Sequence, residues 1–264
     1  MRKYMEVAKI FFKTQIVYRF DVSLTALSVI WRVMFAYIMW GAIFDGRETV
    51  GGFTFQAMLS YYVISSFLAA IDTAGVSGEV SARIRGGTFA KYMVIPTHPL
   101  KHFLAQTFGA AGYYAIFSII AAIACALLFR VDMMFSENPA QIALAGVMII
   151  AGTTFMVSYH FFIGILAFKF QDVGFFLHLQ GSVIEFATGA AVPLALLPVN
   201  ARAVLRFLPF TYVTYMPAML ITGQAEASEG VFGLSALCCW AAVMAVICCF
   251  TYNRLRVRFD GVGI

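Results

Sequence analysis

FLAQTFGAAGYYAIFSIIAAIACALLF, residues 103–129, is an apolar run that contains no charged side chain. Lys101 and His102 precede it, and Arg130 follows it. A helix needs about 20 predominantly apolar residues to cross the hydrocarbon core of a bilayer, which is about 30 Å thick. In lipid, the backbone polar groups of such a segment are satisfied by hydrogen bonds within the helix. The run is therefore long enough to form one membrane-spanning helix.

The composition of the whole chain also indicates a membrane protein. Of its 264 residues, 62% are hydrophobic and 12% are charged, whereas a soluble domain has about 45–50% apolar and about 25% charged residues. We expect an all-α integral membrane protein with a single transmembrane domain over residues 1–264 and six transmembrane helices. The other five apolar runs lie at about residues 24–44, 54–72, 140–168, 174–197 and 231–252.

The distribution of Lys and Arg predicts the orientation of these helices, because basic residues are enriched in cytoplasmic loops. If the N-terminus is cytoplasmic, thirteen of the 18 Lys and Arg residues lie on the cytoplasmic side and Arg32 lies within a span. The four residues on the opposite side are Arg47, Arg130, Arg202 and Arg206. We therefore expect a multi-pass protein of the cell (inner) membrane with both termini in the cytoplasm. The net charge of +5 follows from this topology and does not indicate nucleic-acid binding.

Residues 1–22 have the pattern of an amphipathic helix. Basic residues such as Lys9 and Lys13 recur at helical spacing, and apolar residues such as Phe12 and Ile16 follow the same spacing on another face. We expect this helix to lie in the headgroup plane with its basic side toward anionic membrane lipid. The alternative is a plain cytoplasmic extension of the first span. No small-residue cleavage site follows it, so we do not expect a removed signal peptide.

Residues 198–223 are too polar to span the membrane and too apolar to form a free loop. Pro209 and Pro217 cannot continue a regular helix without cost. We therefore expect a re-entrant or broken-helix hairpin at the outer face, in which the rings of Phe210 and Tyr215 lie at the membrane interface.

Two ionisable residues within the apolar runs are candidates for function, because charge in hydrocarbon is costly. Arg32 lies in the first run, close enough to its cytoplasmic end for the side chain to extend to the headgroups. Glu185 lies near the middle of the fifth run. It is a protonated acid that hydrogen-bonds a neighbouring helix, a partner of Arg32, or a polar point on a translocation path. The sequence leaves these alternatives open.

The longest cytoplasmic connection, residues 73–102, contains SARIRGGTFAKYMVIPTHPLKH at residues 81–102. A polar segment of this length predicts a surface for a cytoplasmic partner. The alternative is a basic loop that only sets the topology, but topology explains neither the break at Gly86-Gly87 nor the rings of Phe89 and Tyr92. Motifs for metal binding, nucleophilic catalysis or phosphate binding are absent, so we expect no enzymatic activity and no cofactor on this chain.

The order of these motifs resembles a known family. The segment Arg83-Ile84-Arg85-Gly86-Gly87-Thr88-Phe89, continuing through Tyr92 to Pro96, resembles a loop of the permease subunits of type 2 ATP-binding-cassette (ABC) exporters. Leu208-Pro209-Phe210 with Tyr215, Pro217 and Gly223 resembles the second motif of that family. Met93 stands where the family commonly has Leu, which is a volume-conserving difference.

The resemblance implies a permease subunit powered by a separate cytoplasmic ATPase, which would bind the ATP and Mg. Residues 73–102 would then contain a coupling helix between spans 2 and 3 that docks on this partner. Arg83 and Arg85 would pair with its acidic residues, while Ile84 and Phe89 would fill an apolar pocket. Gly87, with Gly86, would allow a turn. The coupling set is Arg83, Ile84, Arg85, Gly87, Thr88, Phe89 and Tyr92.

A six-span subunit gives half of a pathway, so we expect a second copy or a related permease beside it. Its aromatic and aliphatic spans suit an amphipathic or hydrophobic cargo, such as a lipid, a drug-like compound or a peptide. Two other classes remain open, a secondary transporter or channel without an ATPase partner and a non-transporting membrane scaffold. The first would be expected to show inverted repeats or several acidic residues in its spans.

Overall fold

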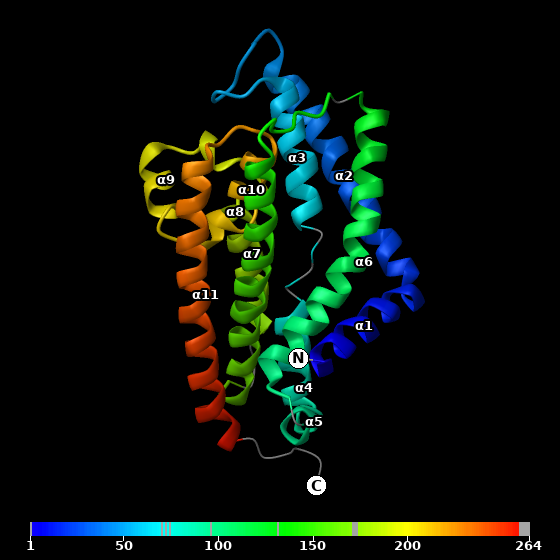
Figure 1. The fold of residues 1–264 in the computed structure, drawn as a ribbon, viewed down its shortest axis with the longest axis vertical. Coiled ribbons are helices and arrows are strands. Elements are labelled where there is room, and N and C mark those ends of the chain that lie inside the picture. The colour runs from blue at the N-terminus through cyan, green and yellow to red at the C-terminus, as the bar shows by residue number, and fades with distance from the viewer. Residues whose placement is uncertain are drawn as a thin grey trace.

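The computed structural model describes residues 2–69, 71, 73, 75–95, 97–130, 132–170 and 174–258. These residues form helices joined by short connections, and they contain no β-strand beyond an isolated bridge between Val50 and Phe53. Figure 1 shows an elongated molecule in which the long helices run roughly parallel to its longest axis. The all-α prediction is confirmed for the described residues.

Four helices are long and apolar enough to cross a membrane. They are α2 (Arg19–Phe44), α6 (Pro99–Leu128), α7 (Pro139–Ile165, continued by η1, Leu166–Phe168) and α11 (Ala227–Leu255). Two of them begin with Pro at the first helical positions, where the missing N–H costs nothing. The side chain of Asn138 caps α7 by accepting a hydrogen bond from the backbone N–H of Ala140 at 3.0 Å.

The other two predicted spans correspond to shorter helices. The helix α3 (Phe55–Ala69) has 15 residues and α8 (Gly174–Ala187) has 14. At 1.5 Å per residue they are about 21–23 Å long, less than the hydrocarbon thickness of about 30 Å. The structure thus supports four spans, or five if the bent pair described below counts as one. Six full-length spans are not confirmed, because apolar composition marks both lipid-facing and protein-facing helices, and α3 is buried almost throughout.

Much of the predicted connection at residues 73–102 is helical. The helix α4 (Gly75–Arg85) lies beyond α3 along the long axis of the molecule and packs on α7. A short helix, α5 (Ala90–Val94), follows at the end of the molecule, and α6 begins at Pro99. The polar segment therefore forms a structured end of the protein.

The N-terminal helix α1 (Arg2–Val17) lies across the lower part of α6 at a steep angle (Figure 1). None of its residues is buried. The ring of Phe12 meets Tyr113 of α6 at a centroid distance of 5.5 Å. A helix separate from the first span was predicted over residues 1–22. In the structure it ends at Val17, and α2 begins at Arg19.

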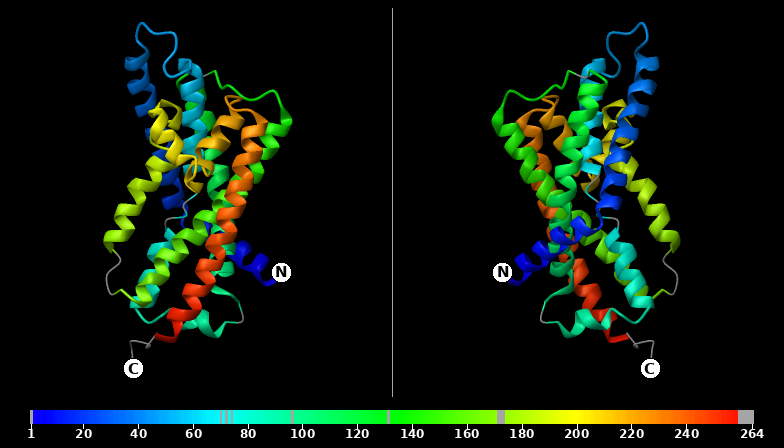
Figure 2. Two further views of the ribbon diagram at one scale, coloured as in Figure 1. Left: turned by 90° about the vertical axis from the view of Figure 1, so that its left-hand side faces the viewer. Right: turned by 90° about the vertical axis from the view of Figure 1, so that its right-hand side faces the viewer.

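Residues 198–223 form a broken helical element, and the outer-face position expected for it stays a prediction. The helix α9 (Val199–Leu205) is followed by η3 (Pro209–Tyr212) and α10 (Tyr215–Ile221), with a bend of 85° between the two halves. Figure 2 shows this element, in yellow and orange, at the end of the molecule away from α4 and α5. Pro209 and Pro217 are buried.

The two aromatic residues expected at the membrane interface pack inward. The ring of Phe210 contacts Phe155 and Tyr159 of α7, at centroid distances of 5.7 and 5.5 Å. Tyr215 contacts Tyr61 of α3 at 6.0 Å. The bend thus turns both rings toward the core between α3 and α7, and their depth relative to the membrane interface stays a prediction.

Candidate functional site

The turn between α4 and α5 is built around Gly87. The helix α4 ends at Arg85, and Gly87 then adopts a positive φ of 71°, a conformation that costs other residues about 1–2 kcal/mol. The backbone N–H of Phe89 donates a hydrogen bond of 2.9 Å to the carbonyl of Arg83. The chain thereby folds back on the end of α4, and the turn predicted at Gly86-Gly87 is present.

Three residues of the predicted coupling set lie inside the protein. Ile84, Phe89 and Tyr92 are buried, and Phe89 is 0% exposed. The ring of Phe89 packs against Tyr92, Phe168 and Tyr252, at centroid distances of 5.3, 5.4 and 6.4 Å. The apolar pocket that receives Phe89 therefore belongs to this chain itself, and a direct contact of Phe89 with a partner would require it to leave this cluster.

Arg83 and Tyr92 are also tied to internal neighbours. The guanidinium of Arg83 lies 2.7 Å from Oε1 of Glu79, and the other oxygen of Glu79 accepts a hydrogen bond of 2.7 Å from Gln106. Burial raises the pKa of Tyr92, and the nearby guanidinium of Arg83 opposes this effect. Arg83 thus already has an acidic partner within its own helix.

The exposed side chains of this region form a compact surface that we call the α4–α5 tip. Its polar part comes from Arg85 and Thr88, which belong to the predicted coupling set, and from Lys91. Its apolar part was missed by the sequence reasoning. Val94 is 85% exposed, and Met93 and Ile95 beside it are 37% and 41% exposed. The signal that could have predicted this apolar part is the run of three apolar residues before Pro96. Pro96 itself lies outside the described residues. The tip consists of Arg85, Thr88, Lys91, Met93, Val94 and Ile95.

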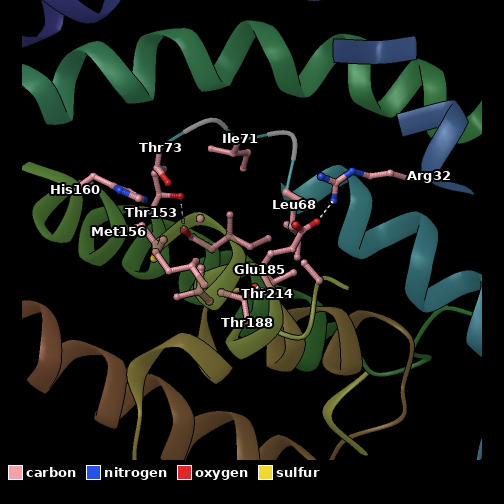
Figure 3. A pocket seen from close by; sticks show the side chains of 16 residues that line it. Arg32, Leu68, Ile71, Thr73, Thr153, Met156, His160, Glu185, Thr188 and Thr214 are labelled. Carbon is pink, nitrogen blue, oxygen red and sulfur yellow. Dashed lines mark hydrogen bonds and ion pairs between the residues drawn. The ribbon is translucent and has the colours of Figure 1, made fainter. Parts of the chain in front are cut away.

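A second candidate site is a cavity of about 190 Å³ lined by residues of α2, α3, α7 and α8 (Figure 3). Arg32 of α2 and Glu185 of α8 meet at its edge, with Nη1 of Arg32 3.1 Å from Oε1 of Glu185. The structure thus resolves an alternative that the sequence left open. Arg32 pairs with Glu185, whereas the sequence had favoured an extension of Arg32 toward the cytoplasmic headgroups.

The rest of the cavity wall combines hydroxyl groups with apolar side chains. Thr153 and His160 come from α7, Thr73 from the connection before α4, and Thr188 from the end of α8. Leu68, Met156 and Ile184 are among the apolar residues. Among the described residues, no group of three His, Cys, Asp or Glu side chains is arranged to hold a metal ion.

The broken element at residues 198–223 closes one side of this cavity. Val213 and Thr214 line it. The backbone N–H of Tyr215 donates to the carbonyl of Thr188 at 3.0 Å, and the hydroxyl of Tyr61 donates to the carbonyl of Gly189 at 2.7 Å. The backbone of Tyr215 is therefore bonded to Thr188, which lines the cavity. Pro209, Phe210 and Pro217 are not among the lining residues.

The sequence was also compared with protein families. The model of the ABC-2 family transporter protein matches residues 29–263, which covers α6, α7, α11, most of α2, both sides of the cavity and the α4–α5 tip. The chain belongs to the ABC-2 transporter family. The ABC-2 protein is therefore a multi-pass membrane protein of the permease type, and permeases of this family generally pair with an ATPase subunit. No curated protein and no solved structure matched the chain.

Proposed function

We propose that the ABC-2 protein is the transmembrane permease subunit of an ATP-driven exporter. Its cargo would be amphipathic or hydrophobic, such as a lipid, a drug-like compound or a peptide. A separate cytoplasmic ATPase subunit would bind the ATP and Mg, so this chain would be neither an enzyme nor a cofactor-binding protein.

The α4–α5 tip is the observation that carries this proposal. It presents Arg85 and Lys91 beside the exposed Val94. An exposed apolar side chain in the same short segment as two cationic ones suits a partner whose surface offers an apolar depression and acidic residues. We propose that the tip is the surface that docks in the ATPase subunit.

The burial of Phe89 supports a mechanical role for the same segment. Its ring contacts Phe168 at the end of α7 and Tyr252 in α11. Closure of two ATPase subunits would push on the tip, and these contacts would transmit the displacement to two long helices. The helices would then change between inward-facing and outward-facing arrangements.

We propose that α3 and α8 are the second and fifth spans of a six-span layout. Both termini and the tip would be cytoplasmic, the broken element at residues 198–223 would face the outside, and α1 would lie in the headgroup plane of the inner membrane. The support is the charge distribution. The connection between α2 and α3, the C-terminal end of α6 and α9 lie at the end of the molecule opposite to α4 and α5, and these segments carry few of the 18 Lys and Arg residues.

Docking can be tested by co-purification with a candidate ABC ATPase subunit from the same organism. The double variant Arg85→Glu with Lys91→Glu is expected to lower the amount of co-purified ATPase about tenfold, which corresponds to about 1.4 kcal/mol of binding free energy. Vanadate-sensitive ATP hydrolysis by the complex should fall in parallel. The physical reason is that reversed charge on the tip would face acidic residues of the partner.

Arg47→Glu is the matched control, because Arg47 is an exposed basic residue in the connection between α2 and α3, at the other end of the molecule. It should leave both measurements unchanged. If the wild-type chain moves cargo without any ATPase, the secondary transporter is favoured. If the ATPase binds equally well to the double variant, the tip is not the docking surface.

A further inference from the structure

We propose that the cavity beside Arg32 and Glu185 binds the polar head of a zwitterionic amphiphile of zero net charge. In this arrangement Arg32 faces the anionic group of the head and Glu185 faces its cationic group. The inference rests on the proposed function, since it assigns a chemical class to the cargo of the permease.

The ion pair is accessible to a ligand. The side chains of Arg32 and Glu185 are 45% and 47% exposed. They line the cavity from two different helices, α2 and α8 (Figure 3). A guanidinium has five N–H donors and a carboxylate has two acceptor oxygens, so one contact at 3.1 Å leaves most of both groups unused. A ligand can therefore bind to each charged group.

The charge balance of the cavity selects the kind of head group. One guanidinium and one carboxylate line it, and their formal charges cancel when histidine is counted as neutral. A ligand with a single charge would pair with one side chain and leave the other without compensation at membrane depth, which is costly. A zwitterion that inserts between the two supplies a partner to each and keeps the sum of charges at zero.

The hydroxyl groups favour a cationic group that carries N–H donors. The Thr153 hydroxyl donates to the carbonyl of Ile149 at 2.8 Å, and the Thr188 hydroxyl donates to the carbonyl of Glu185 at 3.2 Å. Because each hydroxyl proton is used within its own helix, the oxygens remain as acceptors at the cavity. Together with the carboxylate of Glu185, they suit a primary ammonium group.

The size of the cavity indicates that only the head of the ligand enters. Pockets that enclose drug-sized molecules have volumes of about 300–1,000 Å³, and this one has about 190 Å³. Within α8, residues next to Glu185 expose apolar side chains, including Val183 and Phe186 at 56% and 47%. They provide an apolar surface for the chain of an amphiphile whose head occupies the cavity.

The test is competition binding to the purified permease in a nonionic maltoside detergent, without any ATPase. The radiolabelled ligand is lysophosphatidylethanolamine, and the competitors are lysophosphatidylglycerol and an alkylammonium with a chain of the same length. We expect the wild-type protein to bind the zwitterion at least about tenfold more tightly than either singly charged competitor. Equal affinities for all three would overturn the proposal.

Two variants should invert the selectivity. In Arg32→Gln the remaining carboxylate should favour the alkylammonium, and in Glu185→Gln the remaining guanidinium should favour lysophosphatidylglycerol. The charge exchange Arg32→Glu with Glu185→Arg keeps the pair and should keep the preference for the zwitterion, which provides a test if the single variants do not fold. An unchanged order of affinities in the folded single variants would overturn the proposal.

The chain offers a matched control in a second ion pair. Nη2 of Arg206 lies 3.7 Å from Oε1 of Glu229, and neither residue lines the cavity. Arg206→Gln and Glu229→Gln should leave the selectivity unchanged. Free phosphoethanolamine should bind at least about tenfold more weakly than the lysolipid, and equal binding would overturn the assignment to an amphiphile. Because no ATPase is present, failure of ATPase docking does not affect this assay, and loss of charge selectivity leaves the docking result intact.

Discussion

Phe89 shows how one side chain connects the α4–α5 tip to the body of the ABC-2 protein. Its ring contacts Tyr92 in α5, Phe168 after α7 and Tyr252 in α11. The neighbouring Val94, by contrast, is 85% exposed. Two apolar residues in one short segment thus have opposite surroundings, so they should respond differently to substitution.

Replacing Phe89 by Ala should lower the free energy of unfolding by about 3–5 kcal/mol, because a fully buried ring is lost and a cavity remains. Val94→Ala should change it by less than about 0.5 kcal/mol but should weaken ATPase co-purification. Thermal unfolding of the two purified variants measures the difference. A Val94→Ala protein that is destabilised as strongly as Phe89→Ala would contradict these assignments.

At the scale of elements, the attachment of α1 depends on a close approach to α6. No residue of α1 is buried, yet a Cβ atom added at Gly109 of α6 would collide with the backbone of Ala8. The backbone N–H of His98, just before α6, donates to the Tyr4 hydroxyl at 3.3 Å. The two helices therefore touch because α6 offers a glycine at the contact.

Gly109→Ala should displace α1, since a backbone group cannot rotate away as a side chain can. Tryptic cleavage at the exposed Lys9 and Lys13 should become faster, by about tenfold if the displacement costs about 1.4 kcal/mol. Gly112→Ala is the control, because its Cβ would meet only the Phe12 ring at an ordinary 3.6 Å. Equal cleavage rates in both variants and the wild type would show that α1 is held in another way.

The long helices could be predicted from the sequence, but the roles of the short ones could not. Residues 54–72 and 174–197 are as apolar as the runs that form the four long helices, and composition does not distinguish a side chain that faces lipid from one that faces protein. In α3 most side chains are buried inside the protein. The partner of Glu185 was likewise only one of three alternatives, because the distance in sequence between Arg32 and Glu185 gives no information about their distance in space.

At the scale of the whole molecule, the cavity lies on the side from which α2 and α8 project. Figure 2 shows α8 leaning away from α7 on this side. Both helices expose large apolar side chains there, including Phe35 of α2 at 62% and Leu179 of α8 at 52%. If two permeases share one pathway, we expect this side of each to face the other.

A cysteine at position 179, introduced as Leu179→Cys after the native cysteines are replaced, should cross-link two copies in native membranes. Val246→Cys is the control, because Val246 is 68% exposed but belongs to α11. Gel electrophoresis should show a band at twice the 29.1 kDa of the chain for position 179, at least about fivefold stronger than for position 246 if the α8 side is a packed interface. Stronger cross-linking at position 246 would place the interface on the other side.

The pair between Arg32 and Glu185 also has a consequence for biogenesis. A charged residue in a membrane helix raises the cost of its insertion, by up to about 2.5–3.5 kcal/mol at the helix centre. Glu185 lies two residues before the end of α8, which has only 14 residues to offset such a cost. The α2 helix leaves the ribosome long before α8, so Arg32 is already in the membrane when Glu185 arrives. The pairing therefore makes the integration of a late helix depend on an early one, and the nascent chain must keep α2 nearby until α8 has been synthesised.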